Sequence, residues 1–230
     1  MSSFNHIIVT SVERPEKALV EALRKIPVAN IADAIGKPCK STINPEITPA
    51  FKGIKLVGPA VTVKESPDCN LMSHKAIDLM KEGDILVIDV GGYTGSAVGG
   101  YLMSRKMISK KASGVVVDGA WRDLKEITEH RFPVFARAWT PSGPHKDLGG
   151  SVNVPISCGG VVVKPCDVIV GDDDGLVVIP FESLTDILVK AAEIHEKEKA
   201  IMADTRKEII EAPSPYTPDE RLRKMGIKIV

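Results

Sequence analysis

The ten residues from Gly114 to Asp123, GVVVDGAWRD, constrain the fold of this chain more than any other stretch. An apolar, β-branched run of this kind is typical of a buried strand, and Asp-Gly is typical of a turn. A second apolar run, Ile85 to Val90, comes earlier and leads through the glycine-rich turn GGYTGSAVGG into a helical pattern. Strand, helix and strand in this order predict right-handed parallel crossovers in a mostly buried sheet.

The same periodicities extend along the chain and predict its other elements. Helices are expected over residues 15–26, 28–35, 70–80, 96–109 and 181–205, with a short one after Asp123. Strands are expected over residues 54–63, 85–90, 114–117, 133–138, 152–156, 160–163, 167–170 and 175–179. The predicted fold class is α/β: a single domain over residues 1–211, with a central mixed sheet flanked by helices, followed by an extended C-terminal tail, 212–230.

The run from Asp172 to Gly175, DDDG, lies between two apolar strands. It is typical of a tight turn in a hairpin. A calcium-binding loop is the alternative, but the run lacks the alternating oxygen ligands and the distant glutamate of such loops. The turn is therefore the favoured interpretation.

Composition excludes several classes of partner. Thirty Lys and Arg residues balance 30 Asp and Glu, and aromatic residues make up only 4%, so neither a basic footprint nor a stacking platform for nucleic acid is present. No apolar run approaches a membrane span, and no signal peptide is visible, so we expect a cytoplasmic protein with no membrane partner. The cysteines (Cys39, Cys69, Cys158 and Cys166) form no C-x-x-C pair and are expected to be reduced.

The pair Arg122-Asp123 follows the strand that contains Val115 to Val117. Arginine offers a planar fork for a carboxylate, and aspartate is an oxygen ligand for a divalent cation. A surface ion pair, or an N-cap at Asp123 for the following helix, is the structural alternative. The glycine turn upstream could bring backbone N–H groups close to an anion, although it too could be purely structural. It matches neither a dinucleotide-binding fingerprint nor a P-loop.

Four other side chains are candidates for the surroundings of such a site. His74, on a helix, and His145, in the loop PSGPHKDLGG, are lone histidines of a kind that is more often structural or at the surface. His145 is the better candidate of the two for lining a pocket. Trp121 precedes the Arg-Asp pair and is expected to wall the site. Trp139 is expected in the core.

In sequence order, GGYTGSAVGGYL, GVVVDGAWRD and DDDGLVVIP resemble the RraA-like family, and the similarity runs from about Val28 to about Ile201. That family contains class II pyruvate aldolases acting on 4-hydroxy-4-methyl-2-oxoglutarate and 4-carboxy-4-hydroxy-2-oxoadipate. It also contains the regulator of ribonuclease activity A, a non-catalytic binder of a ribonuclease. The resemblance implies a swivelling β/β/α-like domain that forms a homotrimer or homohexamer with sites between subunits.

The resemblance also implies roles for particular residues. Arg122 would bind the carboxylate and carbonyl of a pyruvate moiety, and Asp123 would ligate Mg²⁺ or Mn²⁺ through a water-rich shell. Glu198, from a neighbouring subunit, would approach the metal waters. The residues that would bind substrate are Gly99, Gly100, Tyr101, Leu102 and Arg122, and the catalytic ones Arg122 and Tyr101.

Tyr101 departs from the family. In the pattern Asp-x20-Arg-Asp of the aldolases, the first acidic residue takes part in proton transfer through a water, and here that position is Tyr101. A phenol keeps its proton at neutral pH and is a poor general base unless its environment changes that. Tyr101 could cover the substrate, donate a hydrogen bond or fill space.

The expected function is therefore that of a divalent-metal-dependent carbon–carbon lyase acting on a small, pyruvate-containing oxo-acid. Aldol cleavage of 4-hydroxy-4-methyl-2-oxoglutarate or decarboxylation of oxaloacetate would fit. One alternative is a ring-shaped regulatory protein without catalysis. Another is a metal-dependent enzyme acting on a different sugar acid or oxo-acid.

Overall fold

The computed structural model describes residues 6–36, 41–205 and 218–228. Its helices are α1 (Lys17–Ala22), α2 (Val28–Ile35), α3 (Leu71–Leu79), α4 (Tyr101–Ser109), α5 (Leu124–Glu129), α6 (Leu184–Thr205) and α7 (Pro218–Lys224). Its strands are β1 (Thr48–Pro49), β2 (Leu56–Lys64), β3 (Ile85–Asp89), β4 (Ala97–Gly99), β5 (Gly114–Trp121), β6 (Val134–Trp139), β7 (Ser151–Val152), β8 (Ile156–Cys158), β9 (Val161–Val163), β10 (Val168–Asp172) and β11 (Gly175–Ile179).

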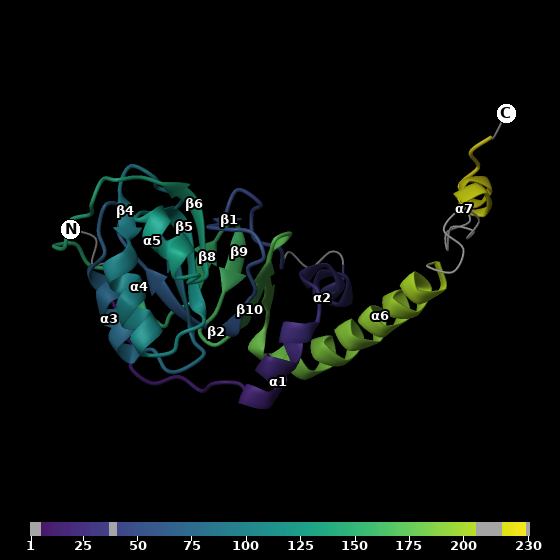
Figure 1. Cartoon of the computed structure of the whole chain (residues 1–230), viewed down its shortest axis with the longest axis horizontal. Coiled ribbons are helices and arrows are strands. Elements are labelled where there is room, and N and C mark those ends of the chain that lie inside the picture. The colour runs from purple at the N-terminus through teal and green to yellow at the C-terminus, as the bar shows by residue number, and fades with distance from the viewer. Residues whose placement is uncertain (1–5, 37–40, 206–217, 229–230) are drawn as a thin grey trace. The chain divides into compact units, whose positions relative to one another are not determined.

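The central sheet is mixed, as the sequence predicts. Its strand order is β1-β6-β5-β3-β2-β10-β11, with β4 added beside β5 and β7 beside β2. The pairs β2–β3, β3–β5 and β5–β6 are parallel, which confirms the crossover connections. Strands β1, β7, β10 and β11 pair antiparallel. The predicted fold class, an α/β domain with a mixed sheet flanked by helices, is confirmed (Figure 1).

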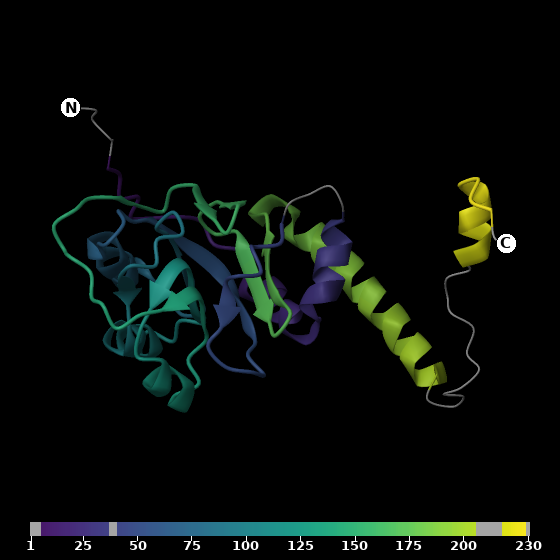
Figure 2. The ribbon, with the colours of Figure 1, turned by 90° about the horizontal axis from the view of Figure 1, so that it is seen from above.

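Alternating side chains bury both faces of the sheet. In β11, Val177 and Ile179 pack with residues of α1, α2 and the start of α6, whereas Leu176 and Val178 pack with β8 and β9. Helices α3, α4 and α5 cover the parallel strands on one side (Figure 1). The hairpin of β10 and β11 lies beside α2 (Figure 2). Successive side chains of a strand point to opposite faces, so the long strands β2, β3, β5, β6, β10 and β11 each contribute to more than one cluster.

The DDDG run forms the predicted hairpin turn between β10 and β11, with Asp172 opposite Gly175. Its carboxylates accept backbone hydrogen bonds. The Asp172 side chain accepts the N–H of Val28 at 3.0 Å and that of Asp174 at 3.1 Å, and Asp173 accepts the N–H of Gly53 at 2.9 Å. These acidic side chains therefore tie the hairpin to neighbouring segments.

Two predictions near the glycine turn need correction. Residues 97–99 form strand β4 beside β5 rather than the start of a helix, and α4 begins at Tyr101. Consecutive glycines at 99 and 100 disfavour helix, which explains the later start. Strand β5 also continues past Val117 to Trp121, because Ala120 and Trp121 still pair with β6. The Arg-Asp pair therefore follows the end of a longer strand than expected.

The chain divides into two compact units, Met1–Ala192 and Glu193–Val230. The predicted boundary between residues 211 and 212 lies outside the described residues and stays a prediction. Within the segment expected to be extended, residues 218–224 form helix α7. Proline at its first position, acidic residues in its first turn and basic residues in its last favour this helix.

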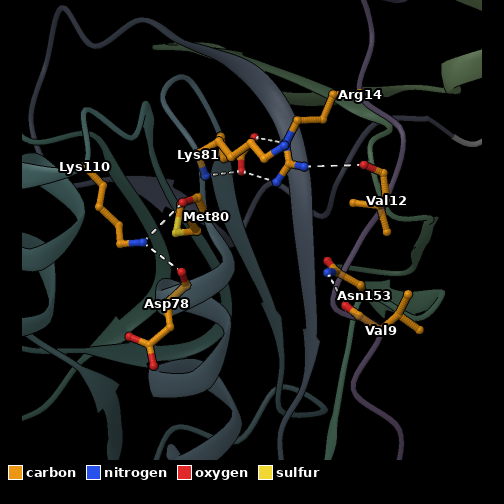
Figure 3. A network of polar contacts seen from close by, with 9 residues as sticks. Val9, Val12, Arg14, Asp78, Met80, Lys81, Lys110 and Asn153 are labelled. Atoms are coloured by element: carbon orange, nitrogen blue, oxygen red, sulfur yellow. Dashed lines mark hydrogen bonds and ion pairs between the residues drawn. The ribbon is translucent and has the colours of Figure 1, made fainter.

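The N-terminal segment is fixed to the first unit by polar contacts (Figure 3). Arg14 donates from Nε and Nη2 to the buried carboxylate of Asp84, at 2.9 and 2.7 Å. Nearer the terminus, Asn153 Nδ2 donates to the carbonyl of Val9 at 2.7 Å. The bidentate geometry of the pair holds the Arg14 side chain in one orientation against Asp84.

Among the described residues, Cys69, Cys158 and Cys166 are buried free thiols; Cys39 lies outside them. Burial raises the pKa of Cys166 to about 11, which leaves the thiol protonated at neutral pH. No helix of the described segments has the length and apolar composition that a membrane crossing requires.

Candidate active site

Arg122 and Asp123 lie between the end of β5 and the start of α5. Asp123 has φ +61° and ψ +43°, the left-handed conformation, which aspartate tolerates better than most residues. Its carboxylate makes no capping bond to α5. Instead Asp123 Oδ2 accepts the N–H of Tyr101 at 2.8 Å. The pair thus projects toward the N-terminus of the neighbouring helix α4.

The two side chains are neither a tight ion pair nor buried. Arg122 Nε lies 3.8 Å from Asp123 Oδ2, and the side chains are 40% and 37% exposed. The backbone N–H of Arg122 donates to the carbonyl of Gly99 at 3.1 Å, which fastens the pair to the glycine turn. Both charged groups are therefore fixed through the backbone while their polar ends stay accessible.

Gly100 makes this close approach possible. A Cβ atom at Gly100 would lie 2.4 Å from Asp123 Oδ2 and 2.7 Å from Arg122 Cγ. A Cβ atom at Gly99 would lie 2.4 Å from the ring of the buried Trp121. The glycines predicted to bind substrate thus leave room for the Arg-Asp pair on one side and for the core on the other.

We expect Gly100→Ala to disorganise the site without unfolding the protein. Gly100 has extended backbone angles that alanine adopts readily, so the added methyl group acts through Asp123 and Arg122, which must move away. A misplacement of catalytic groups by about 1 Å typically costs about 100-fold in turnover. Pyruvate release from an oxo-acid substrate measures the loss. Ser109→Ala, at the far end of α4, is the matched control, and unchanged turnover in Gly100→Ala would contradict the prediction.

A cavity of about 250 Å³ lies at this junction. Its lining comes from the start of α3, the glycine turn, the first turn of α4, the Arg-Asp pair and the loop after β6: Asn70, His74, Gly99, Gly100, Leu102, Met103, Arg122, Asp123, Gly143, Pro144 and Lys146. A second, more open hollow shares Arg122 and Asp123 and is also lined by Trp139. The Arg-Asp pair therefore separates two adjoining spaces.

The charge around the cavity is predominantly positive. Two cationic side chains, Arg122 and Lys146, and one carboxylate, Asp123, line it, and Lys106 and Asp78 lie close enough to influence His74. Burial, together with the positive charges of Lys146 and Lys106, lowers the pKa of His74, so this imidazole is neutral at neutral pH. A cavity with such walls favours an anionic ligand.

Tyr101 contributes its backbone to the site and directs its side chain elsewhere. Its hydroxyl lies 2.7 Å from Nε2 of His130, and the two rings are stacked at a tilt, with centroids 4.7 Å apart. Nδ1 of His130 lies 3.0 Å from the carbonyl of Glu126. A carbonyl can only accept, so Nδ1 carries a proton; in the neutral imidazole Nε2 is then the acceptor, and the Tyr101 hydroxyl donates to it. Tyr101 is absent from the lining of the cavity.

The structure places the other predicted residues as follows. Leu102 is in the first turn of α4, 73% exposed, where a helix offers its N–H no internal acceptor. Glu198 lies on α6, in the second compact unit. Its predicted approach to the site of a neighbouring subunit stays a prediction.

His74 and Trp121 do not have the surroundings expected of them, whereas Trp139 packs against the core as predicted. His74 lines the cavity, whereas His145 is exposed and faces Asp68 at 3.4 Å. Trp121 is fully buried in the core, whereas Trp139 lines the open hollow. Trp121 points inward because β5 continues to this residue, and its ring packs over Gly99. The loop after β6 does line the cavity, through Gly143, Pro144 and Lys146, but the His145 side chain lies against Asp68 instead.

Asn70 is a cavity residue that the sequence analysis missed. It occupies the N-cap position of α3, is 5% exposed, and makes no capping bond. The buried Glu65 caps this helix instead, accepting the N–H of Ser73 at 2.8 Å and that of Met72 at 3.4 Å. An asparagine immediately before an apolar helix was the available signal, although it predicts a cap rather than a cavity.

Burial raises the pKa of Glu65, and the hydrogen bonds from Ser73 and Met72 oppose this shift. A carboxyl whose pKa rises on folding stabilises the folded state fully below its ordinary pKa, and this contribution is lost as pH rises through the raised value. Glu65→Gln cannot ionise and lacks this decline. The free energy of unfolding of the variant, minus that of the unaltered protein, should therefore be larger at about pH 8 than at about pH 5. Urea denaturation at both pH values measures it.

The matched control for that prediction is Glu82→Gln. Lys17 and Lys111 lower the pKa of the exposed Glu82, so it titrates below this pH range. The corresponding difference for Glu82→Gln should hence be the same at both pH values. If the difference in free energy of unfolding for Glu65→Gln were also the same at both pH values, the prediction would be contradicted.

The site has one carboxylate suited to a divalent cation. No group of three or more His, Cys, Asp or Glu side chains positioned to hold a metal occurs within the described ranges. Asp123, exposed at the junction of the two hollows, fits an ion that takes one protein ligand and keeps most of its waters. Mg²⁺ and Mn²⁺ prefer such oxygen-rich surroundings.

Comparison with known proteins is consistent with this architecture. The family described as "RraA-like: Aldolase/RraA" matches residues 28–178. A relative from Halalkalibacterium halodurans, named "Putative 4-hydroxy-4-methyl-2-oxoglutarate aldolase", is 36% identical over 194 residues, covering 83% of this chain and 91% of that protein. The 4-hydroxy-4-methyl-2-oxoglutarate aldolase of Thermus thermophilus is 33% identical over 137 residues, which cover 59% of this chain and 83% of that protein.

Solved structures share the fold. RraAS2 from Streptomyces coelicolor, an unusual member of the RNase ES inhibitor RraA protein family, has a TM-score of 0.73 and 27% identity, covering 84% of this chain and 99% of that one. A protein of Pseudomonas syringae pv. tomato has a TM-score of 0.78 at 22% identity, covering 86% of this chain and 96% of its own. The fold is that of an α/β protein, and its candidate site lies at the end of a strand. The chain belongs to the RraA-like family.

Proposed function

We propose that this protein is a divalent-metal-dependent carbon–carbon lyase acting on a small, pyruvate-containing oxo-acid. The observation that carries the proposal is the accessible Arg122-Asp123 pair, fixed by the backbone to the N-terminus of α4 beside a positively lined cavity. Relatives named as 4-hydroxy-4-methyl-2-oxoglutarate aldolases support a lyase of this type.

The chain's own groups would bind the substrate and orient it. The guanidinium of Arg122 would hold the substrate carboxylate in two parallel hydrogen bonds. The N–H of Leu102 and the partial positive charge at the start of α4 would add to this cradle. Mg²⁺ or Mn²⁺ held by Asp123 would polarise the C2 carbonyl of the substrate. In this arrangement the distal half of the substrate extends toward α3 and the loop of Lys146.

Tyr101 bears on which lyase reaction is fast. Aldol cleavage requires that the C4 hydroxyl lose its proton, whereas decarboxylation of oxaloacetate breaks its carbon–carbon bond without that step. The Tyr101 hydroxyl is engaged with His130 and is itself a donor. We therefore propose that the protein binds both kinds of substrate and cleaves the hydroxylated one slowly.

The test is pyruvate release. Purified protein with Mg²⁺ is incubated separately with oxaloacetate and with 4-hydroxy-4-methyl-2-oxoglutarate, and pyruvate is followed against a control with metal and no protein. We expect release above the control from oxaloacetate and slower release from the hydroxylated substrate. No release from either would overturn the proposal.

The second candidate is a regulatory protein without catalysis, favoured by the likeness to RraAS2 and by the loss of the family's acidic residue at Tyr101. Calorimetry with pyruvate and Mn²⁺ separates the two. The lyase requires binding that is lost in Asp123→Asn, whereas a purely regulatory protein has no need of it.

We further propose a homotrimer or homohexamer in which Glu198 of one subunit approaches the site of the next. The family resemblance supports it, as do exposed apolar side chains on α6 at Val189 and Ile201. Light scattering coupled to gel filtration measures the oligomer. The free cysteines support the expected cytoplasmic location, a reducing compartment.

A further inference from the structure

The side-chain amide of Asn70 has a hydrogen-bond partner at its nitrogen and none at its oxygen. Its Nδ2 donates to the carbonyl of Val98 in β4 at 2.8 Å and approaches the Met103 sulfur at 3.7 Å. Its Oδ1 is buried and has no hydrogen-bond partner. The residue is 5% exposed and lines the cavity beside Arg122. A buried acceptor without a donor is uncommon in a folded protein and calls for an explanation.

The orientation of this amide follows from its partner. The oxygen and nitrogen ends of an asparagine are distinguished by the groups they face. The carbonyl of Val98 only accepts, so it selects the nitrogen end of Asn70. Turning the amide over would bring two oxygens together and leave the nitrogen without an acceptor. The oxygen end is thereby fixed as the one without a donor.

The N-terminus of α3 does not use the Asn70 side chain as a cap. An asparagine at this helix position ordinarily accepts an N–H of the first turn. Here the carboxylate of Glu65 accepts those N–H groups, through Ser73 and Met72. Asn70 is thus released from capping, and its side chain spans from α3 to the glycine turn that carries the proposed substrate cradle.

We infer that Asn70 Oδ1 accepts a hydrogen bond from the C4 hydroxyl of a 4-hydroxy-2-oxo-acid and so makes the site select hydroxylated substrates. The inference rests on the proposed function and specifies its substrate class. Arg122 and Lys146 suit the carboxylates of such a molecule, and neither carboxylates nor a keto oxygen can donate to an amide oxygen. Among the groups of the substrate, the hydroxyl supplies the missing donor.

The test uses a pair of ligands that differ only in that hydroxyl, 4-hydroxy-2-oxoglutarate and 2-oxoglutarate. Binding to the full-length protein is measured by calorimetry, with Mg²⁺ and again with a chelator. Pyruvate is assayed afterwards to verify that the hydroxylated ligand is intact. We expect the hydroxylated ligand to bind about ten-fold more tightly, the discrimination that one buried hydrogen bond supplies.

Two variants locate the effect at Asn70. Asn70→Leu, similar in size and without an acceptor, should bring the affinity ratio of the two ligands to about one while 2-oxoglutarate still binds. Asn70→Asp keeps an acceptor and should still prefer the hydroxylated ligand. Thermal melting verifies that each variant is folded, and the ligand pair tests the unaltered protein without any substitution.

The outcomes separate this inference from the proposal on which it depends. Equal affinity of the unaltered protein for the two ligands would overturn the inference alone, because the hydroxyl would then gain nothing from Oδ1. An unchanged preference in folded Asn70→Leu would also overturn it. Failure of both ligands to bind in either condition would overturn the inference together with the proposed function.

Discussion

Replacing Arg122 with lysine is expected to lower kcat/KM for pyruvate release from oxaloacetate by about 1,000-fold, the effect of removing one preorganised donor group from a charged site. Lysine keeps the charge but loses the planar fork that holds a carboxylate in two hydrogen bonds. The Arg122 side chain passes over Gly100 and Gly143, where a Cβ atom would lie within 2.7 and 3.0 Å of it, so its course is tightly set. A lysine on the same course presents its charge without that geometry.

Arg105→Lys is the matched control for this prediction. Arg105 is exposed on α4 and lines neither hollow, so its replacement should leave kcat/KM within about two-fold, as expected for a solvated surface charge. Equal rates for Arg122→Lys and Arg105→Lys would show that Arg122 does not hold the substrate.

Replacing Tyr101 with aspartate is expected to raise cleavage of 4-hydroxy-4-methyl-2-oxoglutarate by about 100-fold, the lower end of what a positioned general base contributes. The variant restores the acidic residue of the family pattern Asp-x20-Arg-Asp. It adds nothing that decarboxylation of oxaloacetate requires, so that rate should stay within about two-fold. The ratio of the two rates, measured by pyruvate release, is the readout.

Tyr101→Phe tests whether slow aldol cleavage results from the missing acidic residue or whether the tyrosine hydroxyl itself takes part in catalysis. This variant removes only the hydroxyl that donates to His130. We expect unchanged cleavage and a loss of about 1 kcal/mol in the free energy of unfolding, the usual contribution of one such hydrogen bond. A large loss of cleavage in Tyr101→Phe, with no gain in Tyr101→Asp, would instead make the tyrosine hydroxyl part of the catalytic machinery.

Much of the fold could be predicted because burial follows the period of the sequence. The apolar runs at 85–90 and 114–117 became adjacent parallel strands, and helix α2 has the predicted bounds Val28–Ile35. The DDDG run formed its hairpin turn. Each of these elements is stabilised by contacts that its own pattern of apolar and turn residues already specifies.

The surroundings of the site were predicted less well. His145 in a loop was favoured over His74 on a helix as a pocket residue, and Trp121 over Trp139. In the structure His74 lines the cavity, and Trp139, which packs against the core as predicted, also lines the open hollow. Loop composition indicates exposure, but it does not indicate which segment faces a given strand end. Strand β5 also ran further than its β-branched residues indicate, since pairing with β6 sustains it.

By itself, the sequence determined the parallel core and the placement of a cation and a carboxylate at a strand end, because those features depend on local periodicity and on neighbours in the chain. Only the tertiary structure decided what else meets them there. Asn70 faces the cavity because Glu65 caps its helix, and Tyr101 faces His130 because α4 and α5 pack together. Contacts between distant segments choose the partner of each polar group, and no local pattern records that choice.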